Sequence, residues 1–397
     1  QFVSHTGRES QPFYFFETNP QESSQTWQVW RAEFDQMLLD NARGHGVEVR
    51  VGARVLDVLF DGPRAVGVRV QANGGAAEEI PARVLIDASG QSHVIAARLG
   101  IREMDPFLKK GTVWTYYEGA ERLPGIDGGA TLVLYTQQKN GWFWYIPLPD
   151  DITSVGVVSS LDYLFARRRD PQAIYEEQLD CCPAARARVA KGRRVSGFYV
   201  TKDFSYRATR CAGEGWVLVG DAFGFLDPIY SSGVLLALKS GEMAADAVAD
   251  GLARGDLSPE MLGRWEPEFT KGMDRMKRLV YLFYQGFSFG RFVRRYPQYK
   301  LHLIDLLVGN LFTEHVDEAF PAMEALMRES EPMPAGDAPA SSARGGSPQP
   351  AASASQSGNG EPQPPVHEWT DGEWERPASE LHVELACRPG ESPTSSP

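Results

Sequence analysis

The chain has 397 residues, a net charge of −12 and 42% hydrophobic residues, which is typical of a globular protein with one large domain or two smaller ones. The acidic balance argues against a nucleic-acid-binding surface. No apolar run in the sequence is long enough to span a bilayer. The four cysteines do not form a disulfide framework, and Cys181 and Cys182 are adjacent rather than spaced as metal ligands. We therefore expect a reduced, cytoplasmic setting and no metal site.

The first third of the chain reads as alternating strands and helices. Residues 1–5 have the composition of a strand, and Ala32–His45 has the apolar spacing of a helix. Further strands are predicted by their β-branched residues, and a helix follows the strand that ends at Asp87. The predicted strands are 47–49, 54–60, 65–70 and 82–87, and the helix is 92–99.

The middle of the chain changes to a different pattern. Residues 112–160 alternate apolar and polar positions, are rich in aromatics and contain Gly, Pro and Asp turns, which predicts an antiparallel sheet that forms the floor of a substrate site. Helices are predicted at 170–181, 234–249, 258–278, 280–292 and 301–311. From Glu331 onward the chain is rich in Pro, Ala, Ser and Gly, so we expect residues 331–397 to be disordered.

The segment 215–241 carries the most chemical information. An apolar strand, Trp216–Val219, ends in Gly220 and Asp221, and a helix begins near Val234 after Asp227, Pro228, Ser231, Ser232 and Gly233. The strand ends in a carboxylate that can accept a hydrogen bond from a sugar hydroxyl. The first N–H groups of the helix have no partner within the helix and can donate to an electron-rich ring or an anion. The alternative is that Ser231 or Ser232 simply caps the helix, and both roles can coexist.

Two other positions fit a nucleotide cofactor. Arg31, at a helix start, offers a planar donor fork suited to a diphosphate, although it can instead pair with Glu33 or Asp35. The strand 84–87 ends in Asp87, and Gly90 permits a close approach of the backbone to phosphate. Many strands end in Asp and Gly, so this second element is weak in isolation.

The third constellation is Trp142-x-Trp144-x-Ile146-Pro147. In a strand, alternate residues point to the same face, so Trp142, Trp144 and Ile146 form a rigid wall that excludes water. The alternative is an ordinary ladder in the core of a sheet. The position upstream of the Gly-Asp and Ser-Gly-Val segment favours the functional interpretation.

In this order, the motifs resemble those of flavin-dependent halogenases of the tryptophan-halogenase type, within the FAD-dependent monooxygenase superfamily. The resemblance covers about residues 26–250. It implies an α/β fold with a partial Rossmann-like FAD-binding domain (1–110), a substrate-binding antiparallel sheet (111–210), a second FAD-binding segment (211–255) and a helical region (256–330). The Ser231–Val234 version is more similar to phenol and pyrrole halogenases than to enzymes that act on free tryptophan.

The resemblance also assigns residues. It implies FAD binding by Arg31, Val55, Asp87, Gly90, Gly220, Asp221, Pro228, Gly233 and Val234, a halide site at Ser232 and Gly233, and a tunnel wall of Trp142, Trp144, Ile146 and Pro147. The implied reaction uses FADH2 from a separate flavin reductase, oxygen and chloride or bromide. It forms hypohalous acid, which halogenates a small phenol, pyrrole or indole that is free or bound to a carrier protein.

Two family features are absent from this sequence. No GxGxxG occurs, and no lysine stands at the position of the family's catalytic lysine. We expect both to lie upstream of Gln1, together with the first βαβ unit. An aromatic hydroxylase or a reductase of the geranylgeranyl reductase type remains as an alternative, as does a non-catalytic flavoprotein fold that acts as a binding module. A halide-dependent product mass separates the enzymes, and the sequence upstream of Gln1 separates an enzyme from a binding module.

Overall fold

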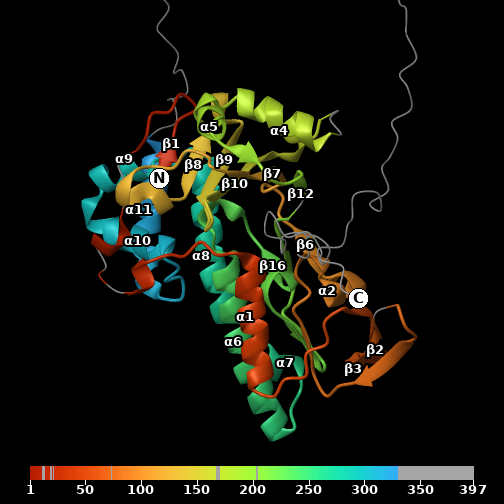
Figure 1. Ribbon diagram of the computed structural model, residues 1–397. Helices are drawn as coiled ribbons and strands as arrows, with labels where there is room; N and C mark the ends of the chain where they lie inside the picture. Colours follow the sequence, from red (N-terminus) through yellow and green to blue (C-terminus); the bar gives the residue numbers. More distant parts are fainter. Residues whose placement is uncertain are drawn as a thin grey trace, which may run out of the picture.

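The computed structural model describes residues 1–329, apart from 11–13, 18–19, 21, 73, 167–169 and 203. The tail predicted to be disordered, 331–397, lies outside the described residues. The fold is mixed α/β, as predicted, with one large, mostly antiparallel sheet, three smaller sheets and two long helices that extend from the large sheet past the smaller ones (Figure 1).

The largest sheet is built from the middle of the chain. Its strand order is β1-β8-β9-β10-β7-β11, with β12 also paired to β7, and every pairing is antiparallel except β1 with β8. Because side chains alternate across a strand, the sheet has two distinct faces. Helices α4 (Pro171–Asp180) and α5 (Pro183–Val189) cover one face (Figure 1). The strands are β1 (Phe2–Val3), β7 (Lys110–Glu118), β8 (Leu132–Tyr135), β9 (Gly141–Pro147), β10 (Ile152–Ser160), β11 (Arg193–Arg194) and β12 (Tyr199–Lys202).

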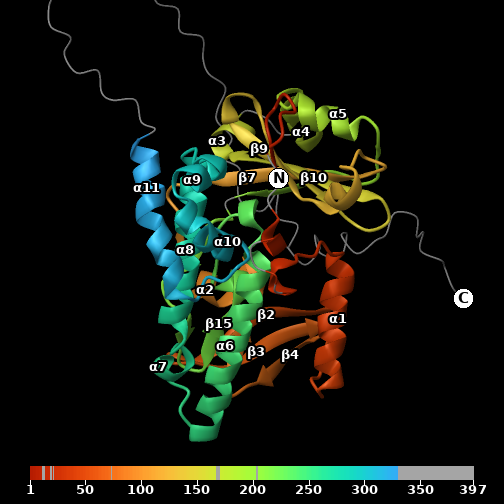
Figure 2. The ribbon, with the colours of Figure 1, turned by 90° about the vertical axis from the view of Figure 1, so that its left-hand side faces the viewer.

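The smaller sheets lie below the large sheet in Figure 2, alongside α6. One contains the parallel pair β5 (Leu85–Asp87) and β15 (Trp216–Leu218), with β14 (Ala212–Gly213) antiparallel to β15. A second contains β2 (Ala53–Asp61), β3 (Arg64–Ala72) and β4 (Ala77–Pro81). The third contains β16 (Gly224–Phe225), β13 (Tyr206–Ala208) and β6 (Arg102–Met104).

Two long helices connect these parts. Helix α6 (Gly233–Arg254) follows the segment after β15, and α8 (Glu266–Tyr284) packs Phe269 and Met273 against the buried residues of β14 and β15. The last turns of α8 reach the large sheet, where Val280 and Phe283 pack with Trp142. The site described below lies where α8, the start of α6 and the large sheet meet. The remaining α-helices are α1 (Arg31–Gly44), α2 (Val94–Leu99), α3 (Leu161–Leu164), α7 (Pro259–Leu262), α9 (Phe289–Arg295), α10 (Lys300–Leu307) and α11 (Phe320–Arg328).

Some predicted boundaries are wrong. The helix expected over 258–278 is divided, because Ser258 caps the short α7 and Pro267, which lacks an N–H, fits only the first turn of a new helix. That new helix, α8, continues through 280–284 and ends before Gly286, whose φ is +93°. The segment 47–49 forms no strand, and the third strand of its sheet is β4 instead. Among the described helices, none combines the length and the apolar character that crossing a membrane requires.

Candidate functional site

The turn after β15 packs directly against α6. Gly220 has a φ of +56°, and its N–H donates to the Ser240 hydroxyl of α6 at 2.8 Å. A Cβ on Gly220 would lie 3.2 Å from the Cβ of Ala237. Both the backbone angle and the close packing favour glycine at this position. The turn therefore fixes the next residue, Asp221, beside the first turns of α6.

Asp221 is a half-buried acid beside the first turns of α6. None of the described residues donates a hydrogen bond to its carboxylate, and burial raises its pKa to about 6, while the charge of Arg31 opposes that rise. The guanidinium of Arg31 lies near enough to act on Asp221 but makes its hydrogen bonds to Asp35, at 3.0 and 3.1 Å. This is the local partner that the sequence left open for Arg31. Asp221 can accept hydrogen bonds from a ligand hydroxyl.

Asp87 has a different role from Asp221. It ends β5 directly beside Leu218 of β15, because the two strands are parallel and in register. Its carboxylate oxygens accept the backbone N–H groups of Ser89 at 2.9 Å and Ile95 at 2.8 Å. Asp87 therefore shapes the loop that contains Gly90 (φ +61°), and its lone pairs already have protein partners.

The start of α6 presents unsatisfied backbone N–H groups. Pro228 opens a short 3₁₀ turn, Ser231 adopts a left-handed conformation with φ of +53°, and Gly233 begins the helix. Ser232 is 5% exposed, and its hydroxyl does not cap the helix. The first N–H groups of a helix lack intrahelical partners, so Gly233 and Val234 offer donors to an anion or a ring carbonyl.

The predicted tryptophan wall lies on one face of β9. Trp142 and Trp144 have ring centroids 6.4 Å apart, and the strand alternation places Ile146 on the same side. Trp142 packs with Ile229, which belongs to the segment that leads into α6. Pro147 is buried at the end of the strand. The wall and the helix start are therefore neighbours.

Sequence reasoning missed how far this aromatic face extends. Trp114 of β7 lies 6.1 Å from Trp144 and stacks on Tyr199 of β12 at 5.4 Å. Gly156 makes the room, since a Cβ there would lie 2.2 Å from the indole of Trp144. The alternation of Trp114 and Tyr116 about Thr115 is a period-two signal that indicates a shared face.

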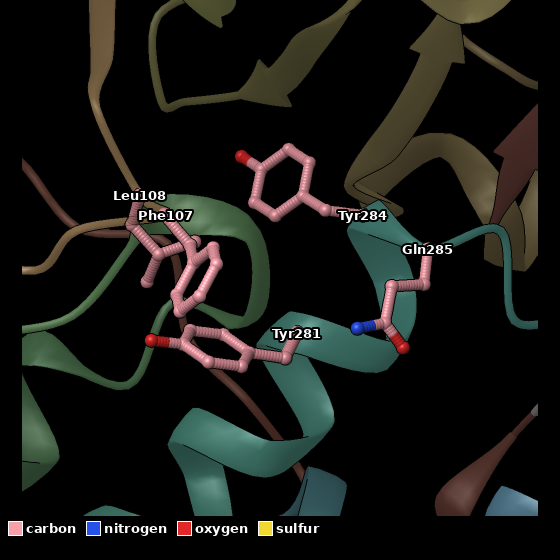
Figure 3. A pocket seen from close by; sticks show the side chains of 5 residues that line it. All are labelled: Phe107, Leu108, Tyr281, Tyr284 and Gln285. Atoms are coloured by element: carbon pink, nitrogen blue, oxygen red, sulfur yellow. The ribbon is translucent and has the colours of Figure 1, made fainter.

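Sequence reasoning also missed a buried polar cluster behind the wall. The indole N–H of Trp142 donates to the hydroxyl of Tyr284 at 3.1 Å, and that hydroxyl donates to Asp227 at 2.9 Å. The ammonium of Lys110 lies 4.0 Å from the centroid of the Tyr284 ring. Tyr284 also lines a pocket with Phe107, Leu108, Tyr281 and Gln285 (Figure 3). No local sequence pattern points to these partners.

Comparison with known proteins decides the family. The family model for tryptophan halogenase matches residues 3–288. The chain belongs to the tryptophan halogenase family. This match confirms the resemblance inferred from the motifs and places the chain in the flavin-dependent oxidoreductases. Cysteines 181, 182 and 211 of this halogenase chain are free thiols.

Relatives and solved structures agree with that assignment. The halogenase chain is 28% identical over 314 residues to the 1H-pyrrole-2-carbonyl-[peptidyl-carrier protein] chlorinase of Pseudomonas fluorescens, which covers 77% of this chain and 70% of the relative. It is 36% identical over 235 residues to the corresponding brominase of Pseudoalteromonas luteoviolacea, which covers 58% and 57%. The structure of the flavin-dependent brominase Bmp2 superposes with a TM-score of 0.69 at 31% identity over 77% of both chains. FAD and a halide are thus the cofactor and co-substrate of this family.

The residues of this halogenase fit part of a flavin. Asp221 supplies an acceptor to which no residue in the described part of the chain donates, the start of α6 supplies donors, and Val234, Leu235 and Leu238 of α6 are exposed apolar side chains beside them. Val55 lies elsewhere, exposed on β2 of another sheet. The sequence-predicted residues therefore divide into three groups. One group surrounds the start of α6, Asp87 and Gly90 shape a neighbouring loop, and Val55 stands apart.

Proposed function

We propose that the protein halogenates an electron-rich aromatic ring, with FADH2 from a separate flavin reductase, oxygen, and chloride or bromide. The observation that carries this proposal is the proximity of the tryptophan wall to the segment 227–233: Trp142 and Ile229 belong to one buried cluster, and the hydroxyl of Tyr284 links Trp142 to Asp227. A wall of indoles beside a helix start brings a water-poor passage to an anion site, and halogenation needs both. Bound reduced FAD supplies, with oxygen, the two-electron oxidation that turns halide into an electrophilic halogen.

The chain's own residues bind and exclude water. Asp221 accepts hydrogen bonds from the hydroxyls of the flavin's ribityl chain, because none of the described residues donates to its carboxylate. The N–H groups at Gly233 and Val234, next to the buried Ser232, hold the halide and the flavin edge. Trp142, Trp144 and Ile146 separate the electrophilic halogen from bulk water. Arg31, Asp87, Gly90, Gly220 and Pro228 shape or approach the cofactor site, and Val55 serves its more distant end.

A pyrrole attached to a carrier protein is the substrate class that we favour. The relatives from P. fluorescens and P. luteoviolacea are named for 1H-pyrrole-2-carbonyl groups on a peptidyl-carrier protein. A pyrrole is small and electron-rich, as the proposed chemistry requires. The half-exposed rings of Trp144, Trp114 and Tyr199 offer flat surfaces on which such a ring can stack.

Two experiments on the protein expressed from its complete gene test the proposal. Asp221→Ala should raise the dissociation constant for FAD about 10- to 100-fold, since a hydrogen bond to a charged group contributes about 1.5–3 kcal/mol. Asp246→Ala, an exposed position on the same helix α6, is the matched control and should leave FAD binding unchanged. Full FAD occupancy in Asp221→Ala would contradict the cofactor assignment.

The second experiment tests the reaction. The protein is given FADH2, oxygen and either bromide or no halide, with a pyrrolyl-carrier protein and with a free phenol. Mass spectrometry should show a brominated product only when bromide is present. A hydroxylated product that forms without halide would instead identify an aromatic hydroxylase.

A further inference from the structure

One hydroxyl joins three elements behind the tryptophan wall. Tyr284 is the last residue of α8, Trp142 lies on β9, and Asp227 precedes the 3₁₀ turn that leads into α6. The Tyr284 oxygen lies 3.1 Å from the indole nitrogen of Trp142 and 2.9 Å from an oxygen of Asp227. Trp142 is 3% exposed and Asp227 is 2% exposed, so water does not compete for these bonds.

The chemistry of the three groups fixes the direction of each bond. An indole N–H only donates, so the hydroxyl of Tyr284 must accept from Trp142. The hydroxyl of Tyr284 has one proton, and with it donates a hydrogen bond to the Asp227 carboxylate. The other oxygen of Asp227 accepts the N–H of Ile229 at 3.0 Å. The Asp227 carboxylate therefore accepts from Tyr284 on one side and from the backbone of the segment leading to Ser232 and Gly233 on the other, and so links that segment to the wall.

Three neighbouring groups partly offset the effect of burial on Asp227. Burial raises the pKa of Asp227 to about 7, while the N–H of Ile229, the hydroxyl of Tyr284 and the charge of Lys110 all oppose that rise. The Lys110 ammonium also lies over the ring of Tyr284, in a cation–π contact. Tyr284 is therefore held on its face by Lys110 and at its hydroxyl by Trp142 and Asp227.

We propose that Tyr284 is a positioning residue for the halide site, which holds the segment 227–233 at a fixed distance from Trp142. The inference rests on the proposed function of the start of α6 and adds the residue that sets its placement. Loss of the Tyr284 hydroxyl removes the hydrogen bonds that it makes with both Trp142 and Asp227. The helix start then moves relative to the wall, and the halide loses its aligned N–H donors.

The same helix provides a matched control. Tyr281, one turn earlier on α8, also donates its hydroxyl to a buried carboxylate, at 2.9 and 2.7 Å from the two oxygens of Asp105. Tyr281 and Tyr284 both line the pocket shown in Figure 3. Asp105 is bound by Lys277 at 2.7 Å, and its other acceptor bonds go to the N–H groups of Phe107 and Leu108. Tyr281→Phe thus removes a comparable bond outside the Trp142–Asp227 link.

The test compares Tyr284→Phe with Tyr281→Phe in the protein expressed from its complete gene. Steady-state rates are measured against bromide and against the aromatic substrate, and FAD affinity is measured separately by flavin fluorescence. For Tyr284→Phe we expect the KM for bromide to rise about tenfold, with kcat reduced less than threefold and the FAD dissociation constant raised two- to threefold. Tyr281→Phe should change the KM for bromide and the FAD dissociation constant by less than twofold.

Several outcomes would overturn the inference. An unchanged KM for bromide in Tyr284→Phe, or a loss of kcat alone, contradicts it while the wild type still brominates. If the wild type shows no bromide-dependent product, the proposed function fails, and an unchanged FAD dissociation constant then also rejects the positioning role. Should Tyr284→Phe not fold, as judged by near-ultraviolet circular dichroism, Trp142→Phe replaces it. That variant removes the indole donor together with part of the ring and should raise the KM for bromide by about threefold, and no rise would reject the proposal.

Discussion

The two faces of the large sheet use the same strands for different purposes. On β9, Phe143 and Tyr145 point to the face closed by α4 and α5 and are 0% and 1% exposed. Their neighbours Trp142 and Trp144 point to the opposite face, toward α8 and the start of α6. There, Trp144, Trp114 and Tyr199 remain half-exposed. Large aromatic rings left partly uncovered are poorly explained by packing alone, and the binding role proposed for this second face would explain them.

The largest expected effect on stability lies on the closed face. Phe143→Ala leaves a cavity beside Tyr175, whose ring meets Phe143 edge-on at 5.8 Å. We expect a loss of about 3–5 kcal/mol in the free energy of unfolding, measured by urea denaturation. The KM for bromide of the remaining folded protein should stay unchanged. A raised KM would show that the two faces are not independent.

The opposite face, which carries Trp144 and Trp114, is the open face. A substitution there should cost less stability and more activity than one on the closed face. Gly156→Ala places a Cβ 2.2 Å from the indole of Trp144 and 2.5 Å from the Cβ of Trp114, so the rings must move. Overpacking of this kind costs about 1–3 kcal/mol. We expect product formation to fall by more than tenfold while FAD affinity is retained.

Val157→Ala is the control for Gly156→Ala, because Val157 is the next residue of β10 and faces α4 and α5. It should lower stability with little change in kcat. If Gly156→Ala and Val157→Ala reduce activity equally, the open face has no special role in the reaction.

A further expected change is the dependence of stability on pH that Asp227 causes. Asp227 has a folded pKa of about 7 against 3.8 when unfolded, so the folded protein binds more protons between these values. Stability therefore falls as pH rises through this window, by at most about 1.4 kcal/mol per pH unit. Of the groups that face Asp227, burial raises the pKa of Tyr284 and Tyr230 well above the usual value and lowers the pKa of Lys110.

Asp227→Asn removes this titration, so its unfolding free energy should depend less on pH between about 4 and 7 than that of the wild type. Urea denaturation at several pH values measures the difference. Parallel pH profiles of the two proteins would mean that Asp227 does not titrate in this window.

The sequence predicted those features that local pattern determines. Alternation placed Trp142 and Trp144 on one face, and the apolar run before Gly220 predicted the strand that delivers Asp221. The partner of Arg31 was within reach of the sequence, because Asp35 stands one helical turn away. The match of Tyr284 with Asp227 and Trp142 was not, since these residues are 57 and 142 positions away along the chain. Only the packing of α8 against the large sheet brings them together.

The spacing of the indoles has a spectroscopic consequence. Trp144 lies 6.1 Å from Trp114 and 6.4 Å from Trp142, with ring planes inclined by 48° and 58°. When two indole rings lie this close together and are inclined to each other, their ultraviolet transitions couple. Such exciton coupling gives paired bands of opposite sign in the circular dichroism spectrum. A molecule that displaces the middle ring alters both couplings at once. The wall of this protein is therefore an intrinsic optical probe of whatever enters beside it, without any added label.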